Sequence, residues 1–166
     1  MQTAADLVAR GLERADLGGD VQSLIVGCLI AGRLNLTQGD IGAAEYYLEK
    51  ARPLVENAQF HHWLGRFHRL QTELWLTQDS LRTAVNWSDR ILQDDSLAKR
   101  PQNEITYMAV ARILLVKGDS AALQQALTLL EKLEQRAGSE GRTAVQIEAL
   151  ALQALTYQKR GDDAKA

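Results

Sequence analysis

Apolar residues recur at intervals of three and four along almost the whole chain, which is the spacing of one face of an α-helix. Short polar turns divide this pattern into eight stretches, each of which predicts a helix. The expected bounds, in chain order, are 3–15, 21–38, 41–57, 59–77, 80–93, 102–117, 120–136 and 142–160. No stretch rich in Val, Ile and Thr alternates in the manner of a strand, so the pattern leaves little room for a sheet.

Four of the turns resemble one another and divide the chain into similar lengths. They read Gln38-Gly39-Asp40, Thr77-Gln78-Asp79, Lys117-Gly118-Asp119 and Arg160-Gly161-Asp162. Glycine favours the left-handed conformation that ends many helices, and aspartate caps the helix that follows. The central residues lie at positions 39, 78, 118 and 161, in steps of 39, 40 and 43 residues. A nearly fixed period in this range predicts an array of helical repeats.

The helices on either side of each turn carry small residues at matching places. Seven residues before the central residue the chain has Gly32, Gln71, Ala111 and Ala154, three of which are small. The helix after each of the first three turns carries an alanine, with further residues four and seven positions later on the same helix face. These sets are Ala44-Leu48-Ala51, Ala84-Ser88-Ile91 and Ala126-Leu130-Leu133. Such spacing lets two antiparallel helices interlock. The predicted fold class is therefore all-α: a right-handed superhelix of stacked antiparallel helix pairs, with about eight helices.

Composition and charge narrow the classes of function. A chain of 166 residues is long enough for one domain with its own core, and we expect residues 1–166 to form a single domain. The formal net charge is -2 and no cluster of Lys and Arg occurs, so we expect no direct contact with nucleic acid. No apolar run approaches the roughly 20 residues of a membrane span. The single cysteine, Cys28, lies in an apolar run and favours a reducing cytoplasm.

The segment Gly39-Asp40-Ile41-Gly42-Ala43-Ala44-Glu45-Tyr46-Tyr47-Leu48-Glu49-Lys50-Ala51 resembles a tetratricopeptide repeat, although units of 39 to 43 residues are longer than the standard 34. Longer units of this kind resemble a narrower group. The stretch 101–166, with its segments 108–119, 129–133, 138–142 and 147–155, resembles the sensor domain of the MalT-like, LuxR-type ATP-dependent transcriptional regulators. The resemblance covers essentially the whole chain.

This resemblance implies a function and a context. In that family the array lies between an N-terminal nucleotide-binding switch module and a C-terminal helix-turn-helix. The array receives a small-molecule inducer or a regulatory protein, and it communicates with the other domains of its parent protein. Neither flanking module occurs in these residues, so we expect the chain to be an excised fragment of a larger bacterial, cytoplasmic protein. The alternative is a generic tetratricopeptide scaffold that binds a segment of a partner protein.

Candidate binding residues follow from the expected stacking. The first helix of each pair in such an array lines the concave side. Steps of three, four and three along these helices place a polar and aromatic set on that face: Arg33, His68, Thr72, Trp75, Arg112 and Gln158. A peptide or a small neutral ligand would suit this wall, with Trp75 as a stacking surface. The alternative is that Trp75 belongs to the core and the arginines are solvated.

Neither a metal site nor catalytic machinery is expected. His61 and His68 share a helix face, but no Cys, Asp or Glu stands three or four positions from either to complete a zinc site. The sequence has no Ser-centred nucleophile elbow and no Cys–His constellation. We therefore expect no enzyme activity and no cofactor in this segment.

Overall fold

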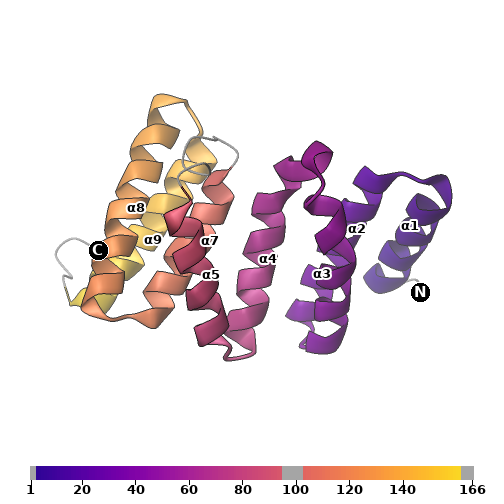
Figure 1. Cartoon of the computed structure of the whole chain (residues 1–166), viewed down its shortest axis with the longest axis horizontal. Coiled ribbons are helices and arrows are strands. Elements are labelled where there is room, and N and C mark those ends of the chain that lie inside the picture. The colour runs from indigo at the N-terminus through magenta and orange to yellow at the C-terminus, as the bar shows by residue number, and fades with distance from the viewer. Residues whose placement is uncertain (1–2, 95–102, 162–166) are drawn as a thin grey trace. The chain divides into compact units, whose positions relative to one another are not determined.

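The computed structural model of the chain describes residues 3–94 and 103–161, and every regular element within those ranges is helical (Figure 1). The elements are α1 (Ala4–Gly18), α2 (Val21–Thr37), α3 (Ile41–Val55), a short 3₁₀ helix η1 (Ala58–Trp63), α4 (Leu64–Thr77), α5 (Leu81–Gln93), α7 (Glu104–Lys117), α8 (Ser120–Ser139) and α9 (Thr143–Arg160). Successive helices from α1 to α4, and again from α5 to α9, pack on one another, as in a tetratricopeptide-like array. The predicted all-α fold of eight sequentially paired helices is confirmed.

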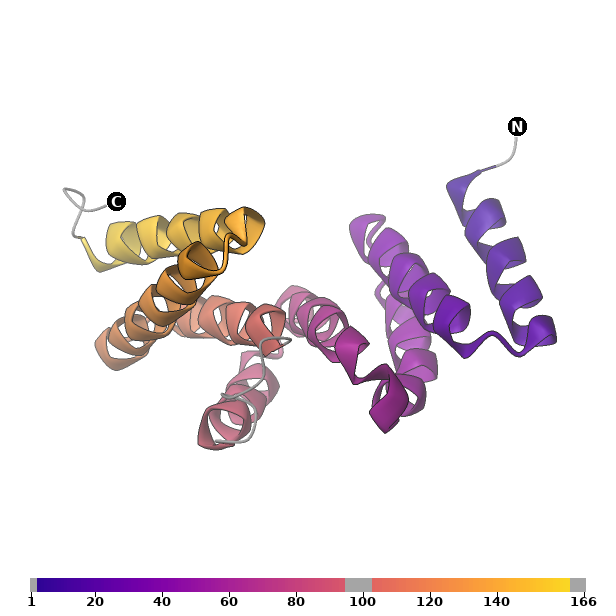
Figure 2. The ribbon, with the colours of Figure 1, turned by 90° about the horizontal axis from the view of Figure 1, so that it is seen from above.

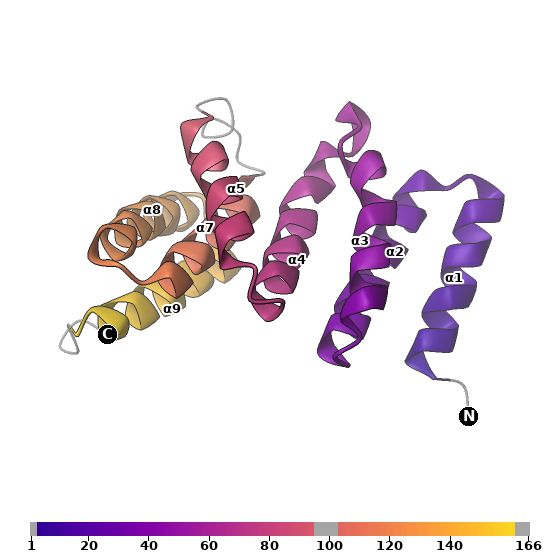
Figure 3. The same ribbon diagram turned by 60° about the horizontal axis from the view of Figure 1, so that its bottom comes forward.

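The packing of the helices divides the chain into two compact units, Met1–Gln78 and Asp79–Ala166. In the first unit α2 packs between α1 and α3, and α4 packs on both α3 and α2 (Figure 3). In the second unit α7 packs on α5, and α7, α8 and α9 all contact one another (Figure 2). The expectation that residues 1–166 form one domain stays a prediction.

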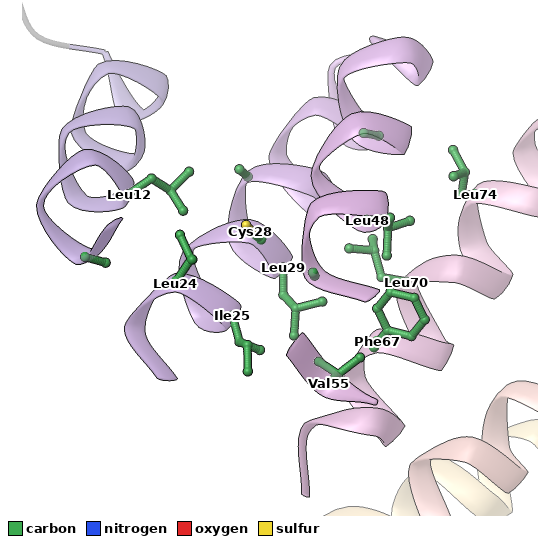
Figure 4. Packing of buried hydrophobic residues seen from close by; sticks show 14 residues of the cluster. Leu12, Leu24, Ile25, Cys28, Leu29, Leu48, Val55, Phe67, Leu70 and Leu74 are labelled. Carbon is green, nitrogen blue, oxygen red and sulfur yellow. The ribbon is translucent and has the colours of Figure 1, made fainter. Parts of the chain in front are cut away.

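The core of the first unit is made of apolar side chains from all four of its α-helices (Figure 4). Ile25 and Cys28 of α2 are fully buried, and Leu48 of α3 and Phe67 of α4 complete the same cluster. Burial raises the pKa of the Cys28 thiol, because the surrounding apolar atoms disfavour the thiolate. Cys28 therefore acts as a small buried side chain of the core.

The core of the second unit lies between α7, α8 and α9. Met108 and Ala111 of α7 pack with Leu130 and Leu133 of α8 and with Leu152 of α9. The longer α8 has 20 residues against 15 in α3, which explains why its interlocking alanine, Ala126, comes later after the turn than Ala44 does.

The turns have the predicted conformation at three positions. Gly39, Gly118 and Gly161 have φ angles of 79°, 72° and 81°, in the left-handed region where an L side chain is strained. The aspartate after each of the first two glycines caps the next helix. Asp40 accepts a hydrogen bond from the Ala43 amide at 3.0 Å, and Asp119 accepts one from the Ala122 amide at 2.8 Å.

The second turn is displaced by one residue from its predicted centre. The left-handed residue there is Asp79, with φ 56°, rather than Gln78, and the following Ser80 makes no capping hydrogen bond. Aspartate is one of the few side chains that tolerate this conformation. Counting from Asp79 moves the small-residue position from Gln71 to Thr72. All four positions, Gly32, Thr72, Ala111 and Ala154, then carry small side chains.

The small residue in α2 marks a close approach of three helices. A Cβ atom placed on Gly32 would lie 3.0 Å from Cδ2 of Leu70 on α4 and 3.5 Å from the Ala44 carbonyl oxygen on α3. The side chain at this place is therefore limited by neighbours on both sides. Contact at this range explains why a small residue stands at position 32.

The first helix, expected to end at 15, continues to Gly18. Two other helix bounds differ from the predicted ones for local reasons. Residues 58–63 form the 3₁₀ helix η1 instead of the start of an α-helix, because the Asn57 side chain accepts a hydrogen bond from the Gln59 amide and fixes a tight first turn. The helix expected to end at 136 continues through Gly138 to Ser139, and Gly141 takes the left-handed turn, with φ 68°. The predicted loop 94–101, apart from Asp94, and Asp162 lie outside the described residues.

Removing the cap of α3 should lower stability measurably. We expect Asp40→Ala to reduce the free energy of unfolding by about 1 kcal/mol, because the Ala43 amide loses its acceptor. Ser80 occupies the matching place before α5 without a capping bond, so Ser80→Ala should cost much less. Urea unfolding followed by helical circular dichroism measures both. Equal losses for the two variants would contradict the role of the turn aspartate.

Candidate functional site

The six predicted binding residues are divided between the two units. Arg33 lies on α2, and His68, Thr72 and Trp75 lie on α4, in the first unit. Arg112 lies on α7 and Gln158 on α9, in the second unit. Their joint role as one binding face stays a prediction, and each group is described within its own unit.

In the first unit the predicted residues differ in accessibility. Arg33 is exposed, and His68 and Trp75 are half-buried, so these three side chains could meet a ligand. Thr72 is 1% exposed, and its hydroxyl has no hydrogen-bond partner within the described part of the chain. Its burial follows from its place seven residues before the left-handed Asp79, which is the small packing position of the repeat.

His68 is held in its neutral form. Burial, assisted by the positive charge of Arg52, lowers the pKa of His68 from 6.5 to about 4. Arg52 binds Glu49 through two guanidinium nitrogens and lies over the Phe67 ring, 5.2 Å from its centroid. A neutral imidazole can both donate and accept a hydrogen bond, which suits an uncharged ligand better than an anion.

In the second unit Arg112 has a carboxylate partner. Its guanidinium forms an ion pair with Glu148, so that the central part of α7 is joined to α9. The Arg112 side chain is 22% exposed, and its Nη1 atom has no hydrogen-bond partner among the described residues. The Nη1 atom is itself buried, so a ligand could meet only the remaining exposed part of this side chain, whose position Glu148 fixes. Gln158 is exposed on α9.

Two further polar contacts join α7 and α9 at their ends. Arg142, the residue before α9, pairs with Glu104 at the start of α7, and the Glu104 side chain is 6% exposed. At the other end, Nζ of Lys159 donates to the carbonyl oxygens of Leu115 and Val116 at 2.8 and 3.2 Å. These carbonyls belong to the last turn of α7, where a cation is favourable. The two helices are thus fixed in register along their whole contact.

Glu104, Arg142 and Glu148 were not among the predicted site residues. Arg112 and Glu148 are 36 residues apart, and Glu104 and Arg142 are 38 apart. Both separations are close to one repeat, so opposite charges about one repeat apart were the available signal. That signal is weak on its own, because many charged residues of a helical chain satisfy it by chance.

Among residues 3–94 and 103–161, no three His, Cys, Asp or Glu side chains come together in a manner that could hold a metal ion. Within the same ranges, no helix has the length and apolar character needed to cross a membrane.

Comparison with known proteins adds one finding. The family model described as the MalT-like TPR region matches residues 2–166, which is nearly the whole chain. No curated protein and no solved structure matches the chain.

Breaking the buried ion pair from one side should destabilise the second unit. Arg142→Ala leaves the Glu104 carboxylate buried without a counter-charge, and we expect a loss of about 3 kcal/mol in the free energy of unfolding. The matched control is Arg136→Ala, which removes the exposed Arg136–Glu140 pair and should cost less than about 1 kcal/mol. Denaturant titration measures both, and a loss from Arg142→Ala no greater than the control would contradict this assignment.

The pH dependence of stability should report on His68. A base whose pKa is lower in the folded state binds its proton more readily when unfolded. The contribution of His68 to the free energy of unfolding should therefore be fully present above pH 6.5, and it should be lost as the pH drops from there toward about 4. We expect His68→Gln to remove the change in the free energy of unfolding between about pH 7 and about pH 5. His62 is exposed, so His62→Gln should leave that change intact. Thermal unfolding at a series of pH values is the measurement.

Proposed function

Because the chain belongs to the MalT-like TPR family, we propose that it is the effector-sensing and protein-interaction domain of a LuxR-type, MalT-like transcriptional regulator. The family match over residues 2–166 is the observation that carries this proposal. The domain would bind a small-molecule inducer or a regulatory protein, and it would pass the signal to a nucleotide-binding module and a helix-turn-helix of its parent protein. Its place of action would be the cytoplasm. The matched region is a repeat region, so we assign no reaction to it.

Polar groups held in fixed positions support a binding role. In the second unit the Arg112 guanidinium is oriented by Glu148, and its helix α7 also carries the buried Met108 and the half-buried Leu115 about one turn to either side. In the first unit the neutral His68 and the half-buried Trp75 lie on one helix, two turns apart. A few positioned polar groups on an otherwise apolar wall are typical of small-molecule sites.

The proposed mechanism is a shift of population between two assemblies of the parent protein. An effector can drive such a shift only if it binds the active assembly more tightly than the inactive one. The proposed ligand class is a peptide or a small neutral molecule, such as an oligosaccharide, that stacks on Trp75. A strongly anionic ligand fits the first unit less well, because His68 stays neutral there.

A thermal-shift screen of the chain against oligosaccharides, nucleotides and peptides should find a ligand, because binding to the folded state raises the melting temperature. For a ligand found in this way, we expect Trp75→Ala to weaken binding by about tenfold, the loss of one stacking surface. Isothermal titration measures the change.

The matched control is Tyr46→Ala, since Tyr46 is an exposed aromatic residue of α3 outside the proposed face. An unchanged affinity in the Trp75 variant would contradict the placement of the site.

The sequence that flanks this segment in its parent protein tests the proposal that the parent is a transcriptional regulator. A phosphate-binding loop before it and a helix-turn-helix after it are expected, and their absence would favour the generic scaffold.

A further inference from the structure

The segment 138–142 joins α8 to α9 and fixes the backbone of Arg142. Gly141 reverses the chain there, with φ 68°. The Arg142 amide donates a hydrogen bond to the Ala137 carbonyl oxygen near the end of α8, at 2.8 Å. The Arg142 carbonyl oxygen in turn accepts hydrogen bonds from amides in the first turn of α9. Arg142 is therefore held by the main chain on both sides before its side chain makes any contact.

The side chain of Arg142 binds two carboxylates. Its Nη1 atom pairs with Oε2 of Glu104 in the first turn of α7, and its Nη2 atom lies 2.9 Å from Oε2 of Glu140. The Glu104 side chain is 6% exposed, whereas that of Glu140 is 46% exposed. The second carboxylate oxygen of Glu104 has no hydrogen-bond partner among the described residues. We call Glu104, Arg142 and Glu140 the clasp.

The helices α7 and α9 are the first helices of their pairs, because each ends at a left-handed glycine. Three polar contacts follow one another in the same order along both, so the two helices run parallel. These are Glu104–Arg142 at their starts, Arg112–Glu148 in the middle, and Lys159 with the last carbonyls of α7. Along the chain Arg142 stands six residues before Glu148, and Lys159 stands eleven after it. The clasp is thus the nearer of the two end contacts to the Arg112–Glu148 pair.

The two ion pairs differ in how strongly they can set the position of α9. The Arg112 and Glu148 side chains are 22% and 30% exposed, and a partly exposed pair contributes little on its own. Separating Glu104 from Arg142 would leave a buried charge without a partner, which is strongly unfavourable. A shift of α9 along α7 is therefore opposed mainly by the clasp.

We propose that the clasp positions Arg112 for binding. By holding the start of α9 against the start of α7, it brings Glu148 to the Arg112 guanidinium and keeps that side chain in one place on the predicted binding face. Glu104 and Arg142 are then positioning residues, because they act on a ligand only through Arg112. This inference rests on the proposed function in one respect, which is that Arg112 belongs to the binding face.

The test removes the clasp without leaving a buried charge. In Glu104→Met/Arg142→Met, two flexible apolar side chains replace the ion pair, a change that is often neutral for stability. Apolar contact permits small shifts along the helix axis, so α9 should lose its single register while the chain keeps its helical circular dichroism. Glu104→Leu/Arg142→Leu is a second variant of the same kind. The matched control is Arg136→Met, which removes the exposed pair with Glu140 and leaves Glu104–Arg142 intact.

The readout is the nuclear magnetic resonance spectrum of the Arg112 guanidinium in the folded chain. An ion pair of fixed geometry slows the rotation of the guanidinium, so its Nη protons give separate signals, whereas free rotation averages them. We expect separate Arg112 signals in the parent chain and in Arg136→Met, and an averaged signal in both variants without the clasp. The signals are assigned by their loss in Arg112→Lys. A change in stability alone would leave them in place, because the folded chain is observed.

Energetic coupling between Arg112 and Glu148 is an independent measurement. In the parent chain, Arg112→Met combined with Glu148→Gln should change the unfolding equilibrium constant about fivefold less than the product of the two separate changes. Without the clasp, the two changes should act independently. Denaturant titration of the single and combined variants in both backgrounds gives the comparison.

Several results would overturn the proposal. They are separate Arg112 signals that persist without the clasp, and coupling between Arg112 and Glu148 that is unchanged there. An averaged Arg112 signal in the parent chain or in the Arg136→Met control would count against it equally. Neither measurement uses a ligand, so an empty thermal-shift screen would contradict the proposed sensing function and leave the positioning of Arg112 standing.

Discussion

The left-handed residue at the end of each first helix, which a capping aspartate follows at Gly39 and Gly118, is the constraint on which the packing depends. It fixes where one helix stops and where the next begins, so it sets which side chains of the pair face each other. Gly39 and Asp40 show the arrangement fully: the glycine adopts φ 79° and the aspartate binds the Ala43 amide. Gly32, seven residues earlier, then meets α3 and α4 at close range. The turn thereby determines interhelical contact at a distance from itself.

Successive first helices are joined differently in the two units. In the first unit α2 and α4 meet at Gly32 and Leu70, where the small residue allows close approach. In the second unit α7 and α9 are joined by Arg112–Glu148, by Glu104–Arg142 and by the contacts of Lys159 with the last carbonyls of α7. Apolar contact tolerates small shifts along the helix axis, whereas ion pairs at both ends of an interface fix one register.

Much of this fold could be predicted from the sequence, because helix periodicity and turn chemistry are local. The start of η1 could not, since its 3₁₀ geometry depends on one hydrogen bond to the Asn57 side chain. The displacement of the second turn to Asp79 could not be predicted either. Both Gln78 and Asp79 are compatible with a turn, and only the φ angle in the structure shows that Asp79 is the left-handed residue. That single residue matters for Thr72, which was predicted on the binding face and is buried at the small packing position.

The candidate site was less accessible to sequence reasoning than the fold. Arg112 was predicted as a binding residue, but its partner Glu148 lies 36 residues away, and only three-dimensional packing brings the two charges together. The neutral state of His68 likewise depends on burial and on Arg52, which belongs to a different helix. Properties of single positions could be predicted, whereas properties of pairs on different helices required the three-dimensional structure.

The extra length of α8 bears on how such arrays vary in evolution. Ala44 follows Gly39 by five residues, and Ala126 follows Gly118 by eight, yet both alanines are fully buried. The difference of three residues is close to one helical turn, so it returns the buried stripe to nearly the same face. A difference of one or two residues would rotate that stripe toward solvent. Insertions and deletions inside these helices should therefore be tolerated mainly when they add or remove about one helical turn. The number of residues in the loops that connect the helices should stay constant.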